Sequence, residues 1–214
     1  MSPGRAHSSK RTRIVILVAV VVAALITGLA LLPDTFSADA DATARISCAD
    51  LLRRNFGPLD DAATSVASAS VVAESDSNAY EYCDVQGTVA RQIQFELRLP
   101  TKMYRQRYLQ EGCGGYCGMV GVSAQPAAST GCAPVTDGSF ALGQDNQGHV
   151  PTSGTGGGSA EVWATNPQLK VDFGYRSEHA FATAAKAITK AFYGAEPTYP
   201  YTAAAVTGPT ASTC

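Results

Sequence analysis

Four glycines and two cysteines lie within nine consecutive positions, in the segment Gln110 to Gly118. Glycine has no Cβ, so a glycine-rich backbone can adopt positive φ and approach a ligand closely. Directly after a strand, such a segment can turn its N–H groups toward an anion or a developing oxyanion. The alternative interpretation is a tight loop held by a disulfide and without a role in catalysis.

Charge and length limit the classes of function. The chain has 214 residues, a net charge of −2 and a hydrophobic fraction of 45%, which suits one domain with a core. Four of the 16 Lys and Arg residues precede Leu32, whereas all 18 Asp and Glu residues follow it. No basic stripe remains after Leu32, so we expect no nucleic-acid partner.

The N-terminus has the composition of a targeting segment. Residues 1–13 are polar and basic, and Ile14 to Leu32 is an apolar run without a charge. This run is long enough to span a bilayer, and Ala38-Asp39-Ala40 or Ala40-Asp41-Ala42 offers a signal-peptidase site. The pattern predicts either a cleaved signal peptide or a retained membrane anchor, and a flexible tether over 33–45. In both cases the rest of the chain is exported, to be secreted or anchored at the membrane.

Export decides how the six cysteines are interpreted. Disulfides persist in an oxidising compartment, so we expect bridges rather than free thiols. Cys113 and Cys117 lack a second cysteine pair or a histidine at ligand spacing, and His149 and His179 are isolated in the sequence. We therefore expect no metal site and no cofactor.

Apolar spacing predicts the elements that position the glycine-rich segment. Ser47 begins a predicted helix over 46–56, and Ser177 begins another that runs to Phe192 and ends at Gly194. Residues 93–99 alternate between apolar and polar side chains, which predicts a strand that buries one face and exposes Gln94, Glu96 and Arg98. Other strands are predicted at 82–87, 107–110 and 140–143, and 62–72 is either a strand or a surface helix. This order predicts an α/β protein.

These pieces also carry a family resemblance. From Cys48 to Tyr201 the chain resembles the N-terminal part of the tannase/feruloyl-esterase family of secreted α/β-hydrolases. Asn146-Gln147 departs from the family's more usual Asp-Thr-Gly-His type of sequence, although Asp145, Gly148 and His149 remain. The matching pieces follow the family's order and are Cys48 with Leu51, Tyr82-Cys83-Asp84-Val85, Ile93 to Pro100, Arg107 to Gly118, Asp145 to His149, Phe173 to His179, and Lys186 to Gly194.

The resemblance implies an α/β-hydrolase fold and a Ser-His-Asp mechanism that cleaves carboxylic esters of aromatic acids. The implied partner is a small-molecule aromatic ester. In such proteins the earlier glycine cluster supplies one oxyanion-hole donor, which makes Gly114 and Gly115 the candidates here. The resemblance also implies a Cys48–Cys83 disulfide. A second bridge is expected between Cys117 and Cys132, with Cys113 as the alternative partner of Cys132.

The family's Gly-Cys-Ser elbow is missing from its expected place after Tyr193 to Tyr201, where this chain has Thr202 to Gly208. Read one frame over, the codons of Thr202 to Gly208 can encode Gly-Cys-Ser-Gly-Asp-Gly. We therefore expect residues 46–201 to be an α/β-hydrolase domain truncated at the nucleophile elbow, followed by an out-of-frame tail over 202–214. Without the nucleophile, Asp and His of a triad, the chain as given is expected to be inactive.

A second class of function stays open at this point. The chain is then an exported, disulfide-stabilised binding or structural domain that never had a triad. The tannase-like order of its pieces favours the esterase hypothesis, and the missing elbow leaves the non-catalytic domain as the alternative.

Overall fold

The computed structural model describes residues 41–112, 116–122, 135–150 and 163–203, all of which belong to the compact unit Ala38–Cys214. Among these residues no helix is both long and apolar enough to cross a membrane. The basic segment 1–13 and the apolar run Ile14 to Leu32 lie outside them, as does the tail from residue 204.

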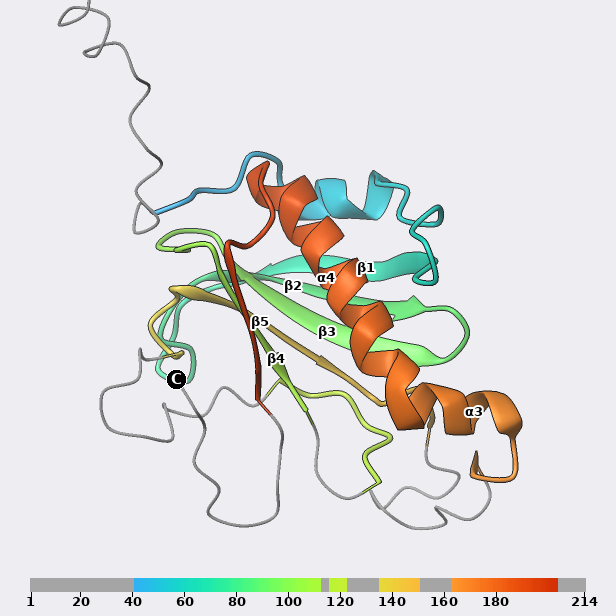
Figure 1. The fold of residues 1–214 in the computed structure, drawn as a ribbon. Helices are drawn as coiled ribbons and strands as arrows, with labels where there is room; N and C mark the ends of the chain where they lie inside the picture. Colours follow the sequence, from blue (N-terminus) through green and yellow to red (C-terminus); the bar gives the residue numbers. More distant parts are fainter. Residues whose placement is uncertain (1–40, 113–115, 123–134, 151–162, 204–214) are drawn as a thin grey trace, which may run out of the picture. The chain divides into compact units, whose positions relative to one another are not determined.

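The described residues form one mixed sheet of six strands with a long helix across one face (Figure 1). The strand order is β1-β2-β3-β5-β4-β6. The first four strands in this order pair antiparallel, whereas β4 pairs parallel with both β5 and β6. The strands are β1 (Thr64–Val72), β2 (Tyr82–Val89), β3 (Ile93–Pro100), β4 (Arg107–Glu111), β5 (Phe140–Asp145) and β6 (Tyr199–Ala203).

The four strands predicted between residues 82 and 143 are confirmed, and the ambiguous segment 62–72 is a strand. Its Ser and Ala residues suit an edge position, because β1 has only one neighbouring strand. Two features differ from the expectation. Residues 199–203 form β6, which no apolar alternation indicated. Glu96 of β3 was predicted to face solvent and is instead buried, at 9% exposure.

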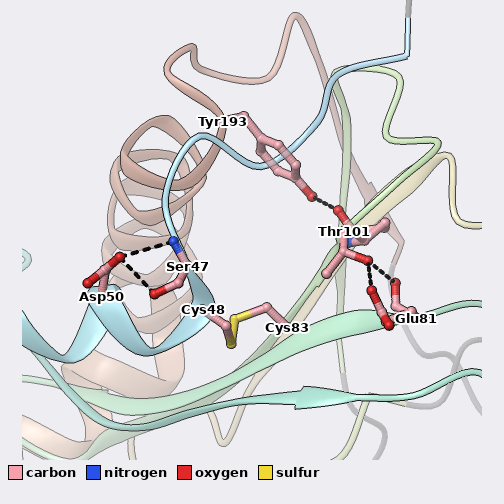
Figure 2. Close-up of a disulfide and its surroundings, with 8 residues drawn as sticks. Ser47, Cys48, Asp50, Glu81, Cys83, Thr101 and Tyr193 are labelled. Carbon is pink, nitrogen blue, oxygen red and sulfur yellow. Dashed lines mark hydrogen bonds between the residues drawn. A yellow bond between two sulfur atoms is a disulfide. The ribbon is translucent and has the colours of Figure 1, made fainter.

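A short 3-10 helix, η1 (Cys48–Arg53), begins the domain and is shorter than the helix predicted over 46–56. Ser47 precedes it as expected, but its backbone N–H and its hydroxyl both donate to the Asp50 carboxylate, at 3.1 and 2.7 Å. Figure 2 shows the disulfide from Cys48 to Cys83 of β2, which confirms the predicted pair. The bridge holds the N-terminal segment against the sheet.

The end of the segment predicted as a tether is bound to the same region. The Ala42 N–H donates to the Tyr104 carbonyl at 2.6 Å, and the Arg45 N–H donates to the Phe192 carbonyl at 2.7 Å. The Tyr104 ring in turn stacks on Tyr193, with ring centroids 3.9 Å apart. Residues 41–45 therefore pack on the domain.

The helical segment before β6 starts earlier than the sequence indicated. It consists of α3 (Pro167–Val171), a single π turn η2 (Asp172–Arg176) and α4 (Ser177–Tyr193), which follow one another without a break. The side chain of Asn166 caps α3 by accepting from the N–H groups of Gln168 and Leu169. The predicted bounds of this helix are confirmed by α4, but Ser177 does not cap it, because α4 continues directly from the π turn. Gly194 ends the run in the left-handed conformation, as predicted.

The core lies between α4 and the sheet. Phe181, Ile188 and Phe192 of α4 are fully buried, as the helical spacing predicted, and Phe181 stacks on Phe95 of β3. Gly143 of β5 permits this approach, since an added Cβ would come within 2.8 Å of the Phe181 ring. At the far end of α4, the Tyr193 hydroxyl donates to the Pro100 carbonyl at 2.7 Å.

Replacing Cys48 and Cys83 together with serine should lower the free energy of unfolding by about 3–4 kcal/mol, because the bridge closes a loop with a sequence separation of 35. Denaturant titration of the oxidised protein and of this variant measures the difference. Under reducing conditions the wild type should lose at least as much, because reduction also opens the disulfide of Cys117. Equal midpoints for the oxidised wild type and the variant would contradict a stabilising role for the bridge.

Candidate active site

The parallel strands β5, β4 and β6 bring three carboxyl ends to one edge of the sheet. Those ends are Asp145, Glu111 and Ala203, and the paired register sets Glu111 opposite both Gln144 and Ala203. In open α/β sheets, ligands bind outside the carboxyl ends of parallel strands. The glycine-rich segment follows β4 at this edge, so the fold positions it where a ligand site is expected.

The glycine-rich segment, called the glycine loop below (Gly112 to Val122), is fixed to the sheet at both ends. At its start the Gly112 N–H donates to the Ala203 carbonyl of β6 at 2.7 Å. At its end the Gly121 N–H donates to the side chain of Gln144 at 2.8 Å, and the Val122 N–H donates to the carboxylate of Glu96 at 3.1 Å. The polar side chains of Gln144 and Glu96 are buried because they anchor this loop.

The middle of the glycine loop contacts an aromatic cluster made of Tyr116, His149, Trp163 and Phe173. The His149 ring stacks on Trp163 with centroids 4.2 Å apart and planes 20° apart, and it meets Phe173 edge-on at 5.7 Å. Tyr116 approaches Trp163 at 6.4 Å and Phe173 at 6.3 Å. The cluster therefore joins the glycine loop to the turn after β5 and to the π turn.

His149 also makes polar contacts with two loops. Its Nδ1 lies 3.4 Å from the Gln147 carbonyl, and the ring hydrogen-bonds to the backbone of Tyr116. Burial lowers the pKa of His149, and these two backbone hydrogen bonds oppose that shift. A lowered pKa keeps the imidazole neutral near pH 7.

The turn after β5 packs directly on the π turn. Gly148 has a φ of +80°, and a Cβ added there would lie 2.4 Å from the Cβ of Asp172. Asp172 is fully buried and accepts hydrogen bonds from Gln168 and Arg176, both at 3.0 Å. Only glycine at position 148 lets the two segments come this close.

Arg176 connects the π turn to two segments that are distant in the sequence. Its guanidinium donates to the Asp61 carboxylate at 3.0 Å, and also to the carbonyls of Asp61 and Ala90, both at 2.8 Å. Together with its ion pair to Asp172, this guanidinium holds the turn between β2 and β3 and the segment before β1. The residues that support the glycine loop are thus fixed by a network that reaches across the domain.

A cluster of polar side chains, separate from the aromatic cluster, lies beneath the carboxyl ends of the strands. The Tyr108 hydroxyl donates to Gln110 at 2.9 Å, and the Gln110 amide donates to the backbone carbonyl and the carboxylate of Glu178 on α4. Asp145 is 2% exposed and accepts from the Gln147 N–H at 2.8 Å. Burial, with the nearby charge of Glu178, raises the pKa of Asp145 to about 7.

His149 and the described cysteines are engaged in contacts within the chain. The two backbone hydrogen bonds of His149 are to Gln147 and Tyr116, and the described cysteines, Cys48, Cys83 and Cys117, are all disulfide-bonded. Within the described ranges, no group of three or more His, Cys, Asp or Glu residues could hold a metal ion.

The candidate residues from the sequence fall into two groups. Gly114 and Gly115 lie outside the described residues, as does Cys132, so the predicted oxyanion donors and the Cys117–Cys132 bridge stay predictions. The predicted Cys48–Cys83 bridge, by contrast, lies among the described residues and is confirmed. Sequence reasoning missed the anchoring roles of Gln144, Asp172 and Arg176. The signal for Gln144 was a polar residue within a largely apolar strand, whereas Asp172 and Arg176 look like surface charges in the sequence.

Comparison with known proteins identifies the family. Residues 77–210, more than half of the chain, match the family model described as tannase and feruloyl esterase. The chain belongs to this family. A search of curated protein sequences finds no significant match.

Solved structures similar to this family member include an esterase from Aspergillus oryzae, with 25% sequence identity and a TM-score of 0.50 over 66% of this chain. Feruloyl esterase B from Aspergillus oryzae has 21% identity and a TM-score of 0.51 over 74% of this chain, which shows similarity of fold alone. The matched regions are 29% and 32% of those two proteins, so the chain spans about a third of their length.

Replacing Asp145 with asparagine should make stability less dependent on pH. Because the folded-state pKa of about 7 lies above the ordinary value of 3.8, the stability that Asp145 contributes is fully present below about pH 4. That stability is lost as the pH rises through about 7. Between pH 4 and pH 8, the free energy of unfolding of the variant minus that of the wild type should therefore rise, by at most about 4 kcal/mol.

Denaturant unfolding across this pH range measures the effect of Asp145→Asn. Asp137→Asn is a matched control, because the exposed Asp137 accepts from the Ser139 N–H two residues ahead in the same way as Asp145 accepts from Gln147. The control should follow the wild type. The same pH dependence for Asp145→Asn and the wild type would show that Asp145 titrates normally in the fold.

Replacing Gly148 with alanine should destabilise the protein by about 1–3 kcal/mol, since the added methyl group overlaps Asp172 and φ is left-handed. Gly174→Ala is the matched control, because a Cβ at Gly174 meets nothing within 4 Å and φ is not left-handed there. Thermal unfolding of both variants measures the difference. Equal melting temperatures for the two variants would contradict the close contact.

Proposed function

We propose that this chain forms the oxyanion-hole part of a carboxylic-ester hydrolase that acts on esters of aromatic acids. The family match over residues 77–210 carries the proposal. It is supported by the glycine loop, which is hydrogen-bonded at both ends at the carboxyl edge of three parallel strands. In this proposal the mixed sheet is the first part of an α/β-hydrolase fold, and the domain works after export.

The proposed donors are the backbone N–H groups of Gly114 and Gly115. An α/β-hydrolase takes one oxyanion donor from an earlier loop and one from the residue after the nucleophile, which follows a parallel strand. β6 is parallel to β4, and its last residue, Ala203, accepts from the Gly112 N–H. The end of a parallel strand and the start of the glycine loop are therefore in contact, which is the arrangement that this mechanism needs.

The nucleophile itself is not among the candidates on this chain. No serine in the 214 residues occurs in a Gly-x-Ser-x-Gly context. We therefore propose that these residues alone do not turn over esters. We also propose that the coding DNA, read in the shifted frame from codon 202, encodes Gly-Cys-Ser and a later Asp and His.

An assay of two proteins tests the function. The 214-residue chain should hydrolyse methyl ferulate no faster than a heat-denatured control, and it should not react with a fluorophosphonate probe. A protein with the shifted frame restored from codon 202 should hydrolyse the ester and lose activity when the elbow serine is replaced with alanine. Turnover by the 214-residue chain would refute the proposed inactivity. A folded but inactive restored protein would favour the non-catalytic exported domain.

A further inference from the structure

The described part of the glycine loop is attached at its two ends, at Tyr116, and at Cys117, which is disulfide-bonded and has its Sγ 3.7 Å from the Asp145 carbonyl. Gly112 extends the strand pairing to β6, and Gly121 and Val122 are held by side chains of the sheet. Between these points, the described contacts of Tyr116 are with the aromatic cluster. Among the described residues, His149 both stacks in the aromatic cluster and makes a polar contact with the backbone of Tyr116.

We infer that His149 is a positioning residue that fixes the backbone of the glycine loop at Tyr116. Its ring is clamped by Trp163 on one face and by Phe173 at an edge, which fixes the direction of the ring nitrogens. One nitrogen faces the Gln147 carbonyl, and the ring also hydrogen-bonds to the Tyr116 backbone. His149 thus connects the turn after β5 to the middle of the loop.

The two rings that hold His149, Trp163 and Phe173, are themselves held by further contacts. Trp163 and Phe173 also contact each other, with ring centroids 4.7 Å apart, so the cluster is closed on itself. Phe173 lies in the π turn, next to the fully buried Asp172 and its ion pair with Arg176. A π turn inserts one residue into a helix and redirects the side chains that follow, often at functional sites. Phe173 lies within this turn and meets the His149 ring edge-on at 5.7 Å.

The role of His149 in catalysis rests on the proposed function, because a loop that presents oxyanion donors has to be held in place before the reaction. The role in positioning the loop does not, since it concerns contacts within this chain. Histidine suits it because the neutral imidazole combines a flat face for stacking with one N–H donor at its edge. Neither phenylalanine nor glutamine has both properties.

Two substitutions separate hydrogen bonding from stacking. His149→Phe keeps a ring against Trp163 and loses both nitrogens, whereas His149→Gln loses the ring and keeps an N–H donor. Backbone 15N order parameters for residues 116–119 of the full chain are the readout. The wild type should be rigid, at about 0.85, and His149→Phe should fall below about 0.6 at these residues. His149→Gln should recover part of the difference.

The controls test whether any change is local. Residues 121 and 122 should keep their order parameters in both variants, because Gln144 and Glu96 still hold them. His179→Phe is the matched control for the substitution itself, since His179 is exposed on α4. It should leave residues 116–119 unchanged. The fluorescence of Trp163, the one tryptophan in the chain, reports whether the aromatic cluster still forms.

The possible outcomes are distinct. Unchanged order at residues 116–119 in His149→Phe would overturn the inference, and so would a loss in His149→Gln alone, which would assign the effect to stacking. If the variants behave as expected but the frame-restored protein has no esterase activity, the proposed function fails and the positioning role stands. If that protein is active, His149→Phe should lower kcat at least tenfold and change KM little, because a misplaced donor weakens the transition state selectively.

Discussion

The parallel pairing of β4 with strands on both sides is the constraint on which the rest of the structure depends. β4 has only five residues, and both of its edges are occupied, by β5 and by β6. Parallel neighbours place their carboxyl ends together, so the loops after β4 and β5 meet at one edge. The buried side chains beneath that edge, among them Gln110 and Asp145, follow from this pairing. With an antiparallel neighbour, the glycine loop and His149 would lie at opposite ends of the sheet.

Much of this fold could be predicted from apolar spacing. Alternation identified β3, and a helical stripe identified the buried face of α4, because both patterns report burial on one side. The family resemblance, rather than spacing, identified the Cys48–Cys83 bridge. β6 could not be found this way, since Tyr199 to Ala203 lie at an edge of the described sheet and carry no buried face. Its partner β4 decides its conformation.

The support of the candidate site was harder to predict, for a physical reason. Glu96 alternates with apolar residues and was assigned to the solvent side, but the chain around Val122 covers that side and uses its carboxylate. Asp172 and Arg176 resemble surface charges in the sequence, but in the π turn Asp172 is fully buried and pairs with the partly buried Arg176. Such residues are recognised from their partners, which come from distant parts of the chain.

The contacts of Arg176 have a consequence for the transfer of this loop to other proteins. One guanidinium joins the π turn, the segment before β1 and the turn between β2 and β3. The glycine loop depends on the π turn through Phe173 and His149, and so depends on those remote segments too. The loop is therefore not a portable module. The smallest unit that could be transplanted runs from Asp61 to the end of β6, because β6 also holds the start of the loop, and this is most of the domain.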